Sequence, residues 1–430
     1  MRNHPRTDRC CTCRGAPDCV DLTTYFIDQN KLYDKSKGKK QPEEPVLVTN
    51  QGVAHDETLF QNLKRFGWAP VRLDVAKISD EMRVEEEKQQ WMISLLSQSS
   101  KWREMIVELF DERIVQLTHK KQTKSLVTFR EAESGSSDGS IEPKQSWEIQ
   151  RSQSAAITPY ETSSSDLVPH RMKAWCDLLH AVAVSVRAAL DLPKHLLLTE
   201  EDDDDTTFSV DLLRAFYYDR VDPSASTTLG SSPHTDWGSF TVVYQDHVGG
   251  LQTYCRQCDK WMDVDAAAEE SPSSSSSILN FIVHVGDITS LVINHAATLH
   301  DETDLVHPNR IMDDESRCHE QLLFPSPRHR VLAPVREKRV SLVYFAYPVP
   351  ELSMSDIIDA MRPWYRRYCG EEPESSICYD DYYVLQNQAA QTTKAKCSQD
   401  ESKARQQFDS IRNLPIRQVL QDKWQQVQRA

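Results

Sequence analysis

One short motif in the sequence combines side chains that could hold a metal ion. In Pro233-His234-Thr235-Asp236-Trp237-Gly238 a histidine and an aspartate stand two residues apart. Side chains at positions i and i+2 of a strand point to the same face, so His234 and Asp236 could be aimed at one point. They make up two thirds of a set of two histidines and one carboxylate, which binds Fe(II) and leaves the opposite side of the ion open. We therefore expect His234 and Asp236 to be metal ligands.

The spacing of a histidine and an acid is not specific by itself. It recurs at His55 with Glu57 and at His300 with Glu302, and a chain with 14 His and 65 Asp or Glu residues contains such pairs by chance. His55 opens a stretch with helical spacing, and His300 lies in a polar insert. Only His234 stands at the entrance of a predicted strand, which favours it over the other two.

A third ligand has to come from elsewhere in the chain, because three ligands on one strand cannot converge on one ion. Our candidate is His329, in Ser326-Pro327-Arg328-His329-Arg330-Val331. Four other histidines lie in the interval before it and stay open as alternatives: His295, His300, His307 and His319.

A possible carboxylate-binding pair follows His329 in the sequence. Arg339 and Ser341 belong to the β-prone run Arg339-Val340-Ser341-Leu342-Val343-Tyr344-Phe345, in which these two side chains share one face. A guanidinium and a hydroxyl could together bind a carboxylate. A metal ion beside such a pair suits a keto acid, because its keto-acid end could chelate the metal while its distal carboxylate meets the arginine.

Taken in order along the chain, these motifs resemble those of the isopenicillin N synthase-like family of iron(II)/2-oxoglutarate-dependent dioxygenases. The resemblance covers residues 207–348 well and residues 46–75 weakly. The matching segments are Leu213–Tyr218, Pro233–Phe240, Gly249–Tyr254 with Trp261, Val285–Asp287 with Ile293-Asn294, His329–Val331, Arg339 with Ser341 and, with low specificity, Phe66–Trp68.

The resemblance implies that His234, Asp236 and His329 are the catalytic iron ligands. The Arg-Val that follows His329, and the later Arg-x-Ser, favour this histidine over its neighbours. The family also implies that Arg339 and Ser341 bind the 2-oxoglutarate carboxylate.

Tyr218 would donate a further hydrogen bond to 2-oxoglutarate in this family, although an ordinary core role stays open. The sequence departs from the family at Phe216, where asparagine is frequent. It departs again in the interval between Asp236 and His329, which is longer than usual.

The fold implied is mainly β with flanking helices: a double-stranded β-helix, or jelly-roll, barrel with a helical N-terminal region and C-terminal helices. Short β-prone runs are expected to supply the strands: Phe208–Val210, Leu213–Tyr218, Ser239–Tyr244, Leu251–Tyr254, Trp261–Val264, Leu279–Val285, Ser290–Asn294 and Val340–Tyr347. The expected divisions are a loose tail over 1–45, a mainly helical region over 46–206 with a disordered insert over about 131–166, the barrel over 207–350 with inserts at about 266–277 and 297–325, and helices over 351–430.

Composition argues against several other functions. The 430 residues include only 12 Gly and no G-x-G-x-x-G or G-x-x-x-x-G-K-[ST] pattern, so a phosphate-binding glycine loop is not expected. A net charge of −15 disfavours a nucleic-acid partner. No stretch approaches the roughly 20 apolar residues of a membrane span, and no apolar leader follows Met1. We expect a cytoplasmic protein that binds neither nucleic acid nor membrane.

The chain has 11 cysteines, and in a cytoplasmic protein we expect them to be mostly reduced. Cys10, Cys11, Cys13 and Cys19 could hold zinc, but no second pair lies at the spacing of a zinc finger. The Cys255-x-x-Cys258 motif could serve redox chemistry or bind zinc, and incidental thiols in an exposed loop are the favoured interpretation.

We therefore predict an Fe(II)/2-oxoglutarate-dependent dioxygenase, an oxidoreductase that uses O2 to hydroxylate or desaturate a small organic substrate and releases succinate and CO2. A monomer is expected. Two alternatives stay open. One is a 2-oxoglutarate-independent iron oxidase of the same fold, in which Arg339 and Ser341 grip the substrate's own carboxylate. The other is a non-catalytic binding protein on that barrel.

Overall fold

The computed structural model describes residues 17–36, 55–81, 87–112, 114–116, 127–131, 133–134, 141–142, 144–154, 167–197, 210–222, 229–255, 258–264, 278–296, 323–369 and 410–429. Several sequence-based expectations lie outside these residues. They concern the insert at 266–277, nearly all of the insert at 297–325 with His300, His307 and His319, and the cysteines Cys10, Cys11 and Cys13.

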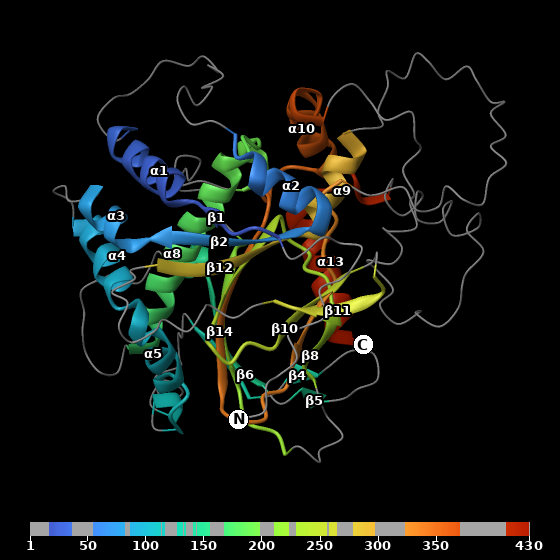
Figure 1. The fold of residues 1–430 in the computed structure, drawn as a ribbon. Coiled ribbons are helices and arrows are strands. Elements are labelled where there is room, and N and C mark those ends of the chain that lie inside the picture. The colour runs from blue at the N-terminus through green and yellow to red at the C-terminus, as the bar shows by residue number, and fades with distance from the viewer. Residues whose placement is uncertain are drawn as a thin grey trace, which may run out of the picture.

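The described strands form one large sheet and one smaller sheet (Figure 1). The large sheet has the order β1-β2-β12-β9-β14-β7-β6-β3 and is antiparallel except for the pair β1–β2. Its strands are β1 (Val20–Asp21), β2 (Trp68–Asp74), β12 (Ile278–Val285), β9 (Phe240–Gln245), β14 (Arg339–Ala346), β7 (Leu212–Tyr218), β6 (Lys144–Gln150) and β3 (Thr128–Arg130).

The smaller sheet is antiparallel throughout, with the order β11-β10-β13-β8. Its strands are β11 (Lys260–Asp263), β10 (Leu251–Cys255), β13 (His329–Leu332) and β8 (Leu229–His234). A separate pair joins β4 (Glu133–Ser134) and β5 (Ile141–Glu142).

From β7 to β14 the chain passes back and forth between the two sheets. The strands β7, β9, β12 and β14 join the large sheet, whereas β8, β10, β11 and β13 join the smaller one. This alternation makes neighbours of strands that are distant in sequence, such as β8 and β13. The expectation of a mainly β core with flanking helices is therefore confirmed.

Helices cover the outer face of the large sheet, with α1, α3, α4, α5 and α8 gathered on one side of it and the smaller sheet on the other (Figure 1). The described helices are α1 (Thr23–Ser36), α2 (Glu57–Phe66), α3 (Val75–Glu81), α4 (Glu87–Ser97), α5 (Trp102–Glu108), α7 (Arg151–Ser154), α8 (Leu167–Ala189), α9 (Asp287–Ala296), α10 (Met354–Cys369) and α13 (Ile416–Arg429), with short 3₁₀ turns at Ser99–Lys101 and Lys194–Leu196.

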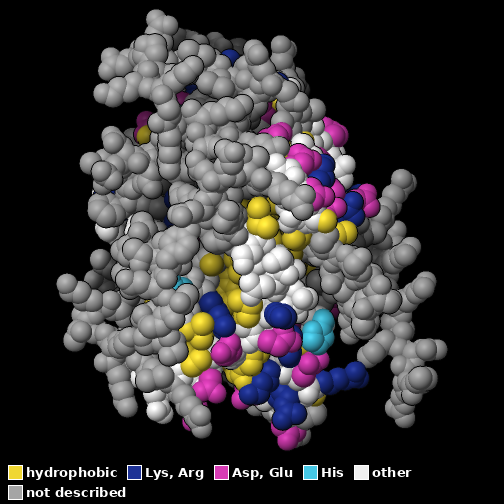
Figure 2. Space-filling model, turned by 90° about the vertical axis from the view of Figure 1, so that its left-hand side faces the viewer, with side chains coloured by type: hydrophobic (Ala, Val, Ile, Leu, Met, Phe, Trp, Pro, Cys, Tyr) yellow, Lys and Arg dark blue, Asp and Glu magenta, His cyan; other side chains and the backbone are white. Residues whose placement is uncertain are grey.

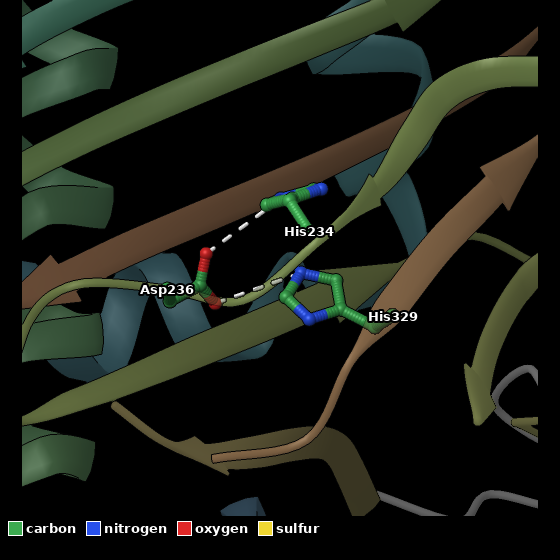
Figure 3. Close-up of side chains that lie close together, drawn as sticks. All are labelled: His234, Asp236 and His329. Carbon is green, nitrogen blue, oxygen red and sulfur yellow. Dashed lines mark ion pairs between the residues drawn. The ribbon is translucent and has the colours of Figure 1, made fainter. Parts of the chain in front are cut away.

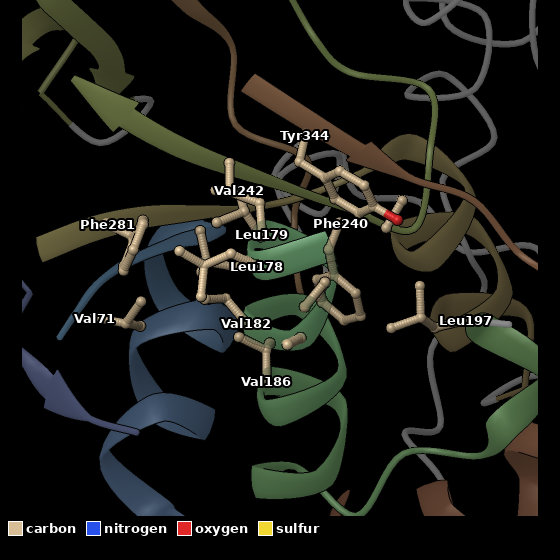
Figure 4. Packing of buried hydrophobic residues seen from close by; sticks show 14 of the residues in the cluster. Val71, Leu178, Leu179, Val182, Val186, Leu197, Phe240, Val242, Phe281 and Tyr344 are labelled. Atoms are coloured by element: carbon tan, nitrogen blue, oxygen red, sulfur yellow. The ribbon is translucent and has the colours of Figure 1, made fainter. Parts of the chain in front are cut away.

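The core lies between α8 and the large sheet (Figure 4). Apolar residues of α8 at positions 178, 179, 182 and 186 follow helical spacing and are fully buried. They pack toward Phe240 and Val242 of β9 and Phe281 of β12. Burying one such side chain stabilises the fold by about 1.5–3 kcal/mol. This packing fixes the positions of β9 and β12. Both strands lie next to the segments that form the candidate metal centre.

The structure differs from the sequence-based expectations in three places. The run Ser290–Asn294 is helical and lies within α9, not in a strand. Its β-branched residues suggested a strand, but Ile288 and Val292, four residues apart, are both buried on one helix face. The expected loose tail contains β1 and α1, whose Leu22 and Phe26 are fully buried.

The third difference concerns the disordered insert expected over 131–166. Residues Lys144–Gln150 form β6, which pairs with β7 along its whole length. Trp147 and Ile149 are buried there, and Trp147 donates its indole N–H to the carbonyl of Leu109. Alternation of polar and apolar residues over this short run was the missed signal for a strand.

The described surface carries charges of both signs. On the face drawn in Figure 2, Lys and Arg side chains lie among Asp and Glu side chains. Of the helices in the described part, none combines the length and the apolar character that crossing a membrane requires.

Candidate metal centre

Two neighbouring strands of the smaller sheet bring two histidines together. His234 is the last residue of β8, His329 is the first of β13, and the two residues are paired directly across the strands. Their ring centroids lie 4.3 Å apart. Asp236 follows two residues after the end of β8 and turns its carboxylate toward both rings (Figure 3).

The convergence of His234 and Asp236 has a different cause from the one expected. His234 ends a strand and does not begin one, so Asp236 lies in the irregular segment beyond it. The backbone carbonyl of Asp236 accepts a hydrogen bond from the Asp287 amide at 2.7 Å, which anchors this segment to the start of α9. The loop, and not strand periodicity, therefore aims the carboxylate.

Two glycines allow this close approach. A Cβ on Gly286 would lie 1.9 Å from the carbonyl oxygen of Gly238, and the Gly286 amide donates to the Ser239 carbonyl at 2.9 Å. Real Cβ atoms essentially never come that close to a backbone oxygen. The segment that carries Asp236 can therefore lie against the end of β12 only because residue 286 lacks a side chain.

The distances between the three side chains fit one small ion. Asp236 Oδ1 lies 3.7 Å from His234 Nε2, and Asp236 Oδ2 lies 3.6 Å from His329 Nε2. One ligand atom from each residue falls within 4.8 Å of the other two, and no other group of His, Cys, Asp or Glu in the described part of the chain does the same. The structure thus brings together the three residues expected from the sequence.

Backbone carbonyls orient both imidazole rings. His234 Nδ1 bonds to the Ser232 carbonyl at 2.7 Å, and His329 Nδ1 bonds to the Pro327 carbonyl at 3.1 Å. A carbonyl only accepts, so Nδ1 of each ring carries the proton and Nε2 keeps its lone pair. Both lone pairs face Asp236. Such outer bonds are the usual way in which proteins fix the tautomer of a metal-binding histidine.

The electrostatics keep the site in a metal-binding protonation state. Burial lowers the pKa of His234 to about 4, and the neighbouring His329 adds to this effect. Burial alone would raise the pKa of the Asp236 carboxyl, but the facing His329, His284 and His234 rings together hold it well below its usual range. A neutral imidazole and an ionised carboxylate are the forms that bind a metal ion.

An unsatisfied oxygen supports the fit of a cation. Asp236 is 6% exposed, and its Oδ2 is buried without a hydrogen-bond partner. No Lys or Arg of the described residues forms an ion pair with it. A buried carboxylate without a cation is costly, and two imidazole nitrogens with one carboxylate are the donor set that suits Fe(II). The residues present therefore fit this metal.

The carboxylate-binding pair expected from the sequence, Arg339 and Ser341, which we call the carboxylate clamp, is also buried. Arg339 is 1% exposed and donates from Nε to the Gly249 carbonyl at 2.6 Å, from Nη1 to Ser341 Oγ at 3.0 Å and from Nη2 to Gln245 Oε1 at 3.3 Å. All three acceptors are neutral. The charge of Arg339 acts on the buried Asp246 carboxylate, but Asp246 forms its ion pair with Arg103 at 3.3 Å, and no carboxylate of the described residues lies within ion-pair distance of Arg339.

Tyr218 and Phe216 line the same face of the large sheet. Tyr218 of β7 is paired with Arg339 across the strands, and the guanidinium lies over its ring at 4.8 Å from the centroid. Phe216 is paired with Ser341 in the next row. Tyr218 is 3% exposed. The structure places Tyr218 at the clamp, and its hydroxyl as a donor to 2-oxoglutarate stays a prediction.

Sequence reasoning missed three residues near the centre. His284 of β12 is fully buried, and its Nδ1 lies 3.8 Å from Asp236 Oδ2. Lys144 of β6 and Glu142 form a buried ion pair at 2.6 Å, and Lys144 also donates to Ser231 of β8 at 3.3 Å. A polar residue at an inward position of an apolar strand was the available signal for His284.

The remaining candidates lie apart from this cluster. His295 is buried in α9 and does not belong to the group of three. His55 stacks on the ring of Tyr368. Cys258 is disulfide-bonded. Cys19 is a free, exposed cysteine.

A known protein family matches the part of the chain that carries these strands and the cluster of His234, Asp236 and His329. The model of the 2OG-Fe(II) oxygenase superfamily matches residues 209–348. This segment contains all eight strands from β7 to β14, together with His234, Asp236, His329 and Arg339. Residues 209–348, about a third of the chain, are thus similar to this superfamily.

Known proteins resemble shorter parts of the chain. Feruloyl CoA ortho-hydroxylase 1 of Arabidopsis thaliana is 24% identical over 166 residues, which are 38% of this chain and 34% of that protein. Gibberellin 20 oxidase 1 of the same plant is 29% identical over 124 residues, 28% of each chain. The chain thus spans about a third or less of the length of these relatives. A crystal structure of Neurospora crassa T7H in complex with alpha-KG aligns with a TM-score of 0.47 at 15% identity, covering 86% of this chain and 95% of that one.

Proposed function

We propose that this protein is an Fe(II)- and 2-oxoglutarate-dependent oxygenase that hydroxylates or desaturates a small organic substrate and releases succinate and CO2. One observation carries the proposal. Asp236, in the loop after β8 of the smaller sheet, has a buried carboxylate oxygen without a hydrogen-bond partner, and Arg339, on β14 of the large sheet, has a buried guanidinium that donates only to neutral acceptors. A metal ion would satisfy Asp236, and the distal carboxylate of a keto diacid would satisfy Arg339.

The alternation of strands between two sheets supports a double-stranded β-helix, or jelly roll, as the fold of 207–350. In this arrangement inward side chains of both sheets face a shared interior. The residues around this domain would form the N-terminal helical region over 46–206 and the C-terminal helices over 351–430. A monomeric state and a cytoplasmic location stay predictions from composition.

His234, Asp236 and His329 would hold the iron. When bound, Fe(II) with 2-oxoglutarate supplies oxidising power from O2 through decarboxylation of the keto acid. The protein contributes the rest of the chemistry. The Ser232 and Pro327 carbonyls keep both Nε2 lone pairs turned to the ion, and the burial of Asp236 and His329 limits access of water.

Arg339 and Ser341 would bind the distal carboxylate of 2-oxoglutarate. The guanidinium has five N–H donors, and three are engaged by neutral acceptors, so two remain for a ligand. The bond from Arg339 Nε to Gly249 fixes the plane of the fork before the ligand arrives. Preorganisation of this kind lowers the entropic cost of binding.

The experiment is a turnover assay with Fe(II), ascorbate, 2-oxoglutarate and O2, in which succinate is quantified across a panel of small substrates. The wild-type protein should produce succinate, and Asp236→Ala should abolish its formation. His247→Ala serves as the matched control because His247 is an exposed histidine that pairs with Glu337 and not with the cluster. Unchanged succinate formation by Asp236→Ala would refute the ligand assignment.

A further inference from the structure

His284 is a buried polar side chain without a satisfied hydrogen bond. It is 0% exposed, and neither its Nδ1 nor its Nε2 has a partner. The residue lies near the end of β12, where it is paired with Trp68 of β2 on one side and with Thr241 of β9 on the other. Leaving such a group unpaired costs about 1–3 kcal/mol, so its presence in an otherwise apolar strand calls for a function.

The ring of His284 faces the second unsatisfied group of the centre. Its Nδ1 lies 3.8 Å from Asp236 Oδ2, and that oxygen also has no hydrogen-bond partner. The ring centroid lies 4.6 Å from that of His329. A donor and an acceptor, both buried and both unpaired, thus stand opposite each other at slightly more than bonding distance. A shift of about 0.8 Å would bring the pair to an ordinary hydrogen bond.

His284 does not belong to the ligand group itself. Among the described residues, only His234, Asp236 and His329 each offer an atom within 4.8 Å of the other two. His284 Nδ1 and His329 Nε2 both approach the carboxylate at Oδ2, at 3.8 Å and 3.6 Å, whereas His234 Nε2 approaches it at Oδ1, at 3.7 Å. Nε2 of His234 and of His329 keeps its lone pair, so His284 is the ring of the three that can donate a hydrogen bond, and it faces Oδ2.

We propose that His284 is a positioning residue for the metal centre: its Nδ1–H donates to Asp236 Oδ2 in the metal-bound protein and turns Oδ1 toward the ion. This inference rests on the proposed function, because it requires that Asp236 binds a metal. Hydrogen bonds to ligating carboxylates orient them, and losing such a partner typically costs 10–100-fold in metal affinity.

The test measures Co(II) binding to the metal-free full-length protein by calorimetry, without 2-oxoglutarate or substrate. His284→Leu removes the donor and should weaken Co(II) binding about 10–100-fold. His284→Asn places an amide N–H close to the position of Nδ1 and should restore most of the affinity. Thr241→Val is the matched control, because Thr241 lies opposite His284 and its buried hydroxyl is also unpartnered. It should bind Co(II) like the wild type.

The visible spectrum of bound Co(II) gives a second readout. The band positions of saturated His284→Asn should match those of the wild type, because the ligand set is unchanged. A clear shift of these bands would show that His284 is itself a ligand and would overturn the positioning role. Equal loss of affinity in His284→Asn and His284→Leu would overturn it as well.

The outcomes separate this inference from the proposed function. If the wild-type protein binds no Co(II), the proposed function fails and the role of His284 fails with it. If the wild type binds Co(II) and folded His284→Leu binds it equally well, only the role of His284 is wrong. If His284→Leu does not fold, His284→Gln decides, because its longer amide reaches toward the position of Nε2. It should bind Co(II) more weakly than His284→Asn, and equal affinity would overturn the role.

Discussion

Replacing Arg339 by methionine tests the carboxylate clamp. Methionine keeps much of the length of the side chain and removes its charge and all of its donors. Two N–H groups of the guanidinium are free for a ligand, and each hydrogen bond to a charged partner contributes about 1.5–3 kcal/mol. The expected loss is about 3–6 kcal/mol, or roughly a 10²–10⁴-fold higher Kd for 2-oxoglutarate.

The assay is calorimetric titration of the Co(II)-loaded protein with 2-oxoglutarate and, separately, with 2-oxobutyrate. The second acid keeps the chelating keto-carboxylate and lacks the distal one. Arg339→Met should therefore leave the affinity for 2-oxobutyrate within about threefold of the wild type. Comparing both proteins with both acids gives the coupling energy between Arg339 and the distal carboxylate. Equal weakening of both acids would refute the role of Arg339, because it would indicate general damage to the site.

The stability of the protein provides the control. Arg339→Met loses the hydrogen bonds to Gly249, Ser341 and Gln245, which contribute about 1 kcal/mol each, but it also removes a buried cation whose desolvation costs several kcal/mol. These effects oppose each other. The free energy of unfolding in urea, measured without ligand, should change by no more than about 1 kcal/mol.

Three further predictions concern the surroundings of the centre. Ser341→Ala should raise the Kd of 2-oxoglutarate about tenfold in the same titration, since it removes one hydroxyl from the clamp. Lys144→Met should lower the free energy of unfolding by about 3–5 kcal/mol in urea, because it leaves the buried Glu142 carboxylate unpaired, and the double variant with Glu142→Gln should recover part of that loss. Gly286→Ala should lower the melting temperature and weaken Co(II) binding, because its Cβ would meet a backbone oxygen at 1.9 Å. A Gly286→Ala protein with wild-type melting and affinity would contradict the packing argument.

The strands of the core could be predicted from sequence because period-two alternation is a local property. The runs at β7, β9, β10, β12 and β14 were found within one or two residues of their observed ends. The same reasoning failed at Ser290–Asn294, where β-branched residues stand in a helix that is stabilised by packing. It also missed Lys144–Gln150, where the alternation of polar and apolar residues is short and the strand is completed by pairing with β7.

Residue types and their order in the chain were enough to predict which residues form the candidate site, but not how they are arranged. His234, Asp236 and His329 were found, yet the geometric reason given for the first two was wrong. The loop after β8 aims Asp236, and its path depends on a contact with Gly286 about fifty residues later. His284 stood outside every motif, so its position behind Asp236 became visible only when β12 was placed beside β9.

The most direct test of the central claim is an anaerobic titration of the protein with Fe(II) and 2-oxoglutarate, followed by visible absorption. We predict a weak charge-transfer band that requires both the metal and the keto acid, is absent in Asp236→Ala, and needs more 2-oxoglutarate to develop in Arg339→Met. If the folded wild-type protein with Fe(II) shows no such band at saturating 2-oxoglutarate, the proposed function is wrong.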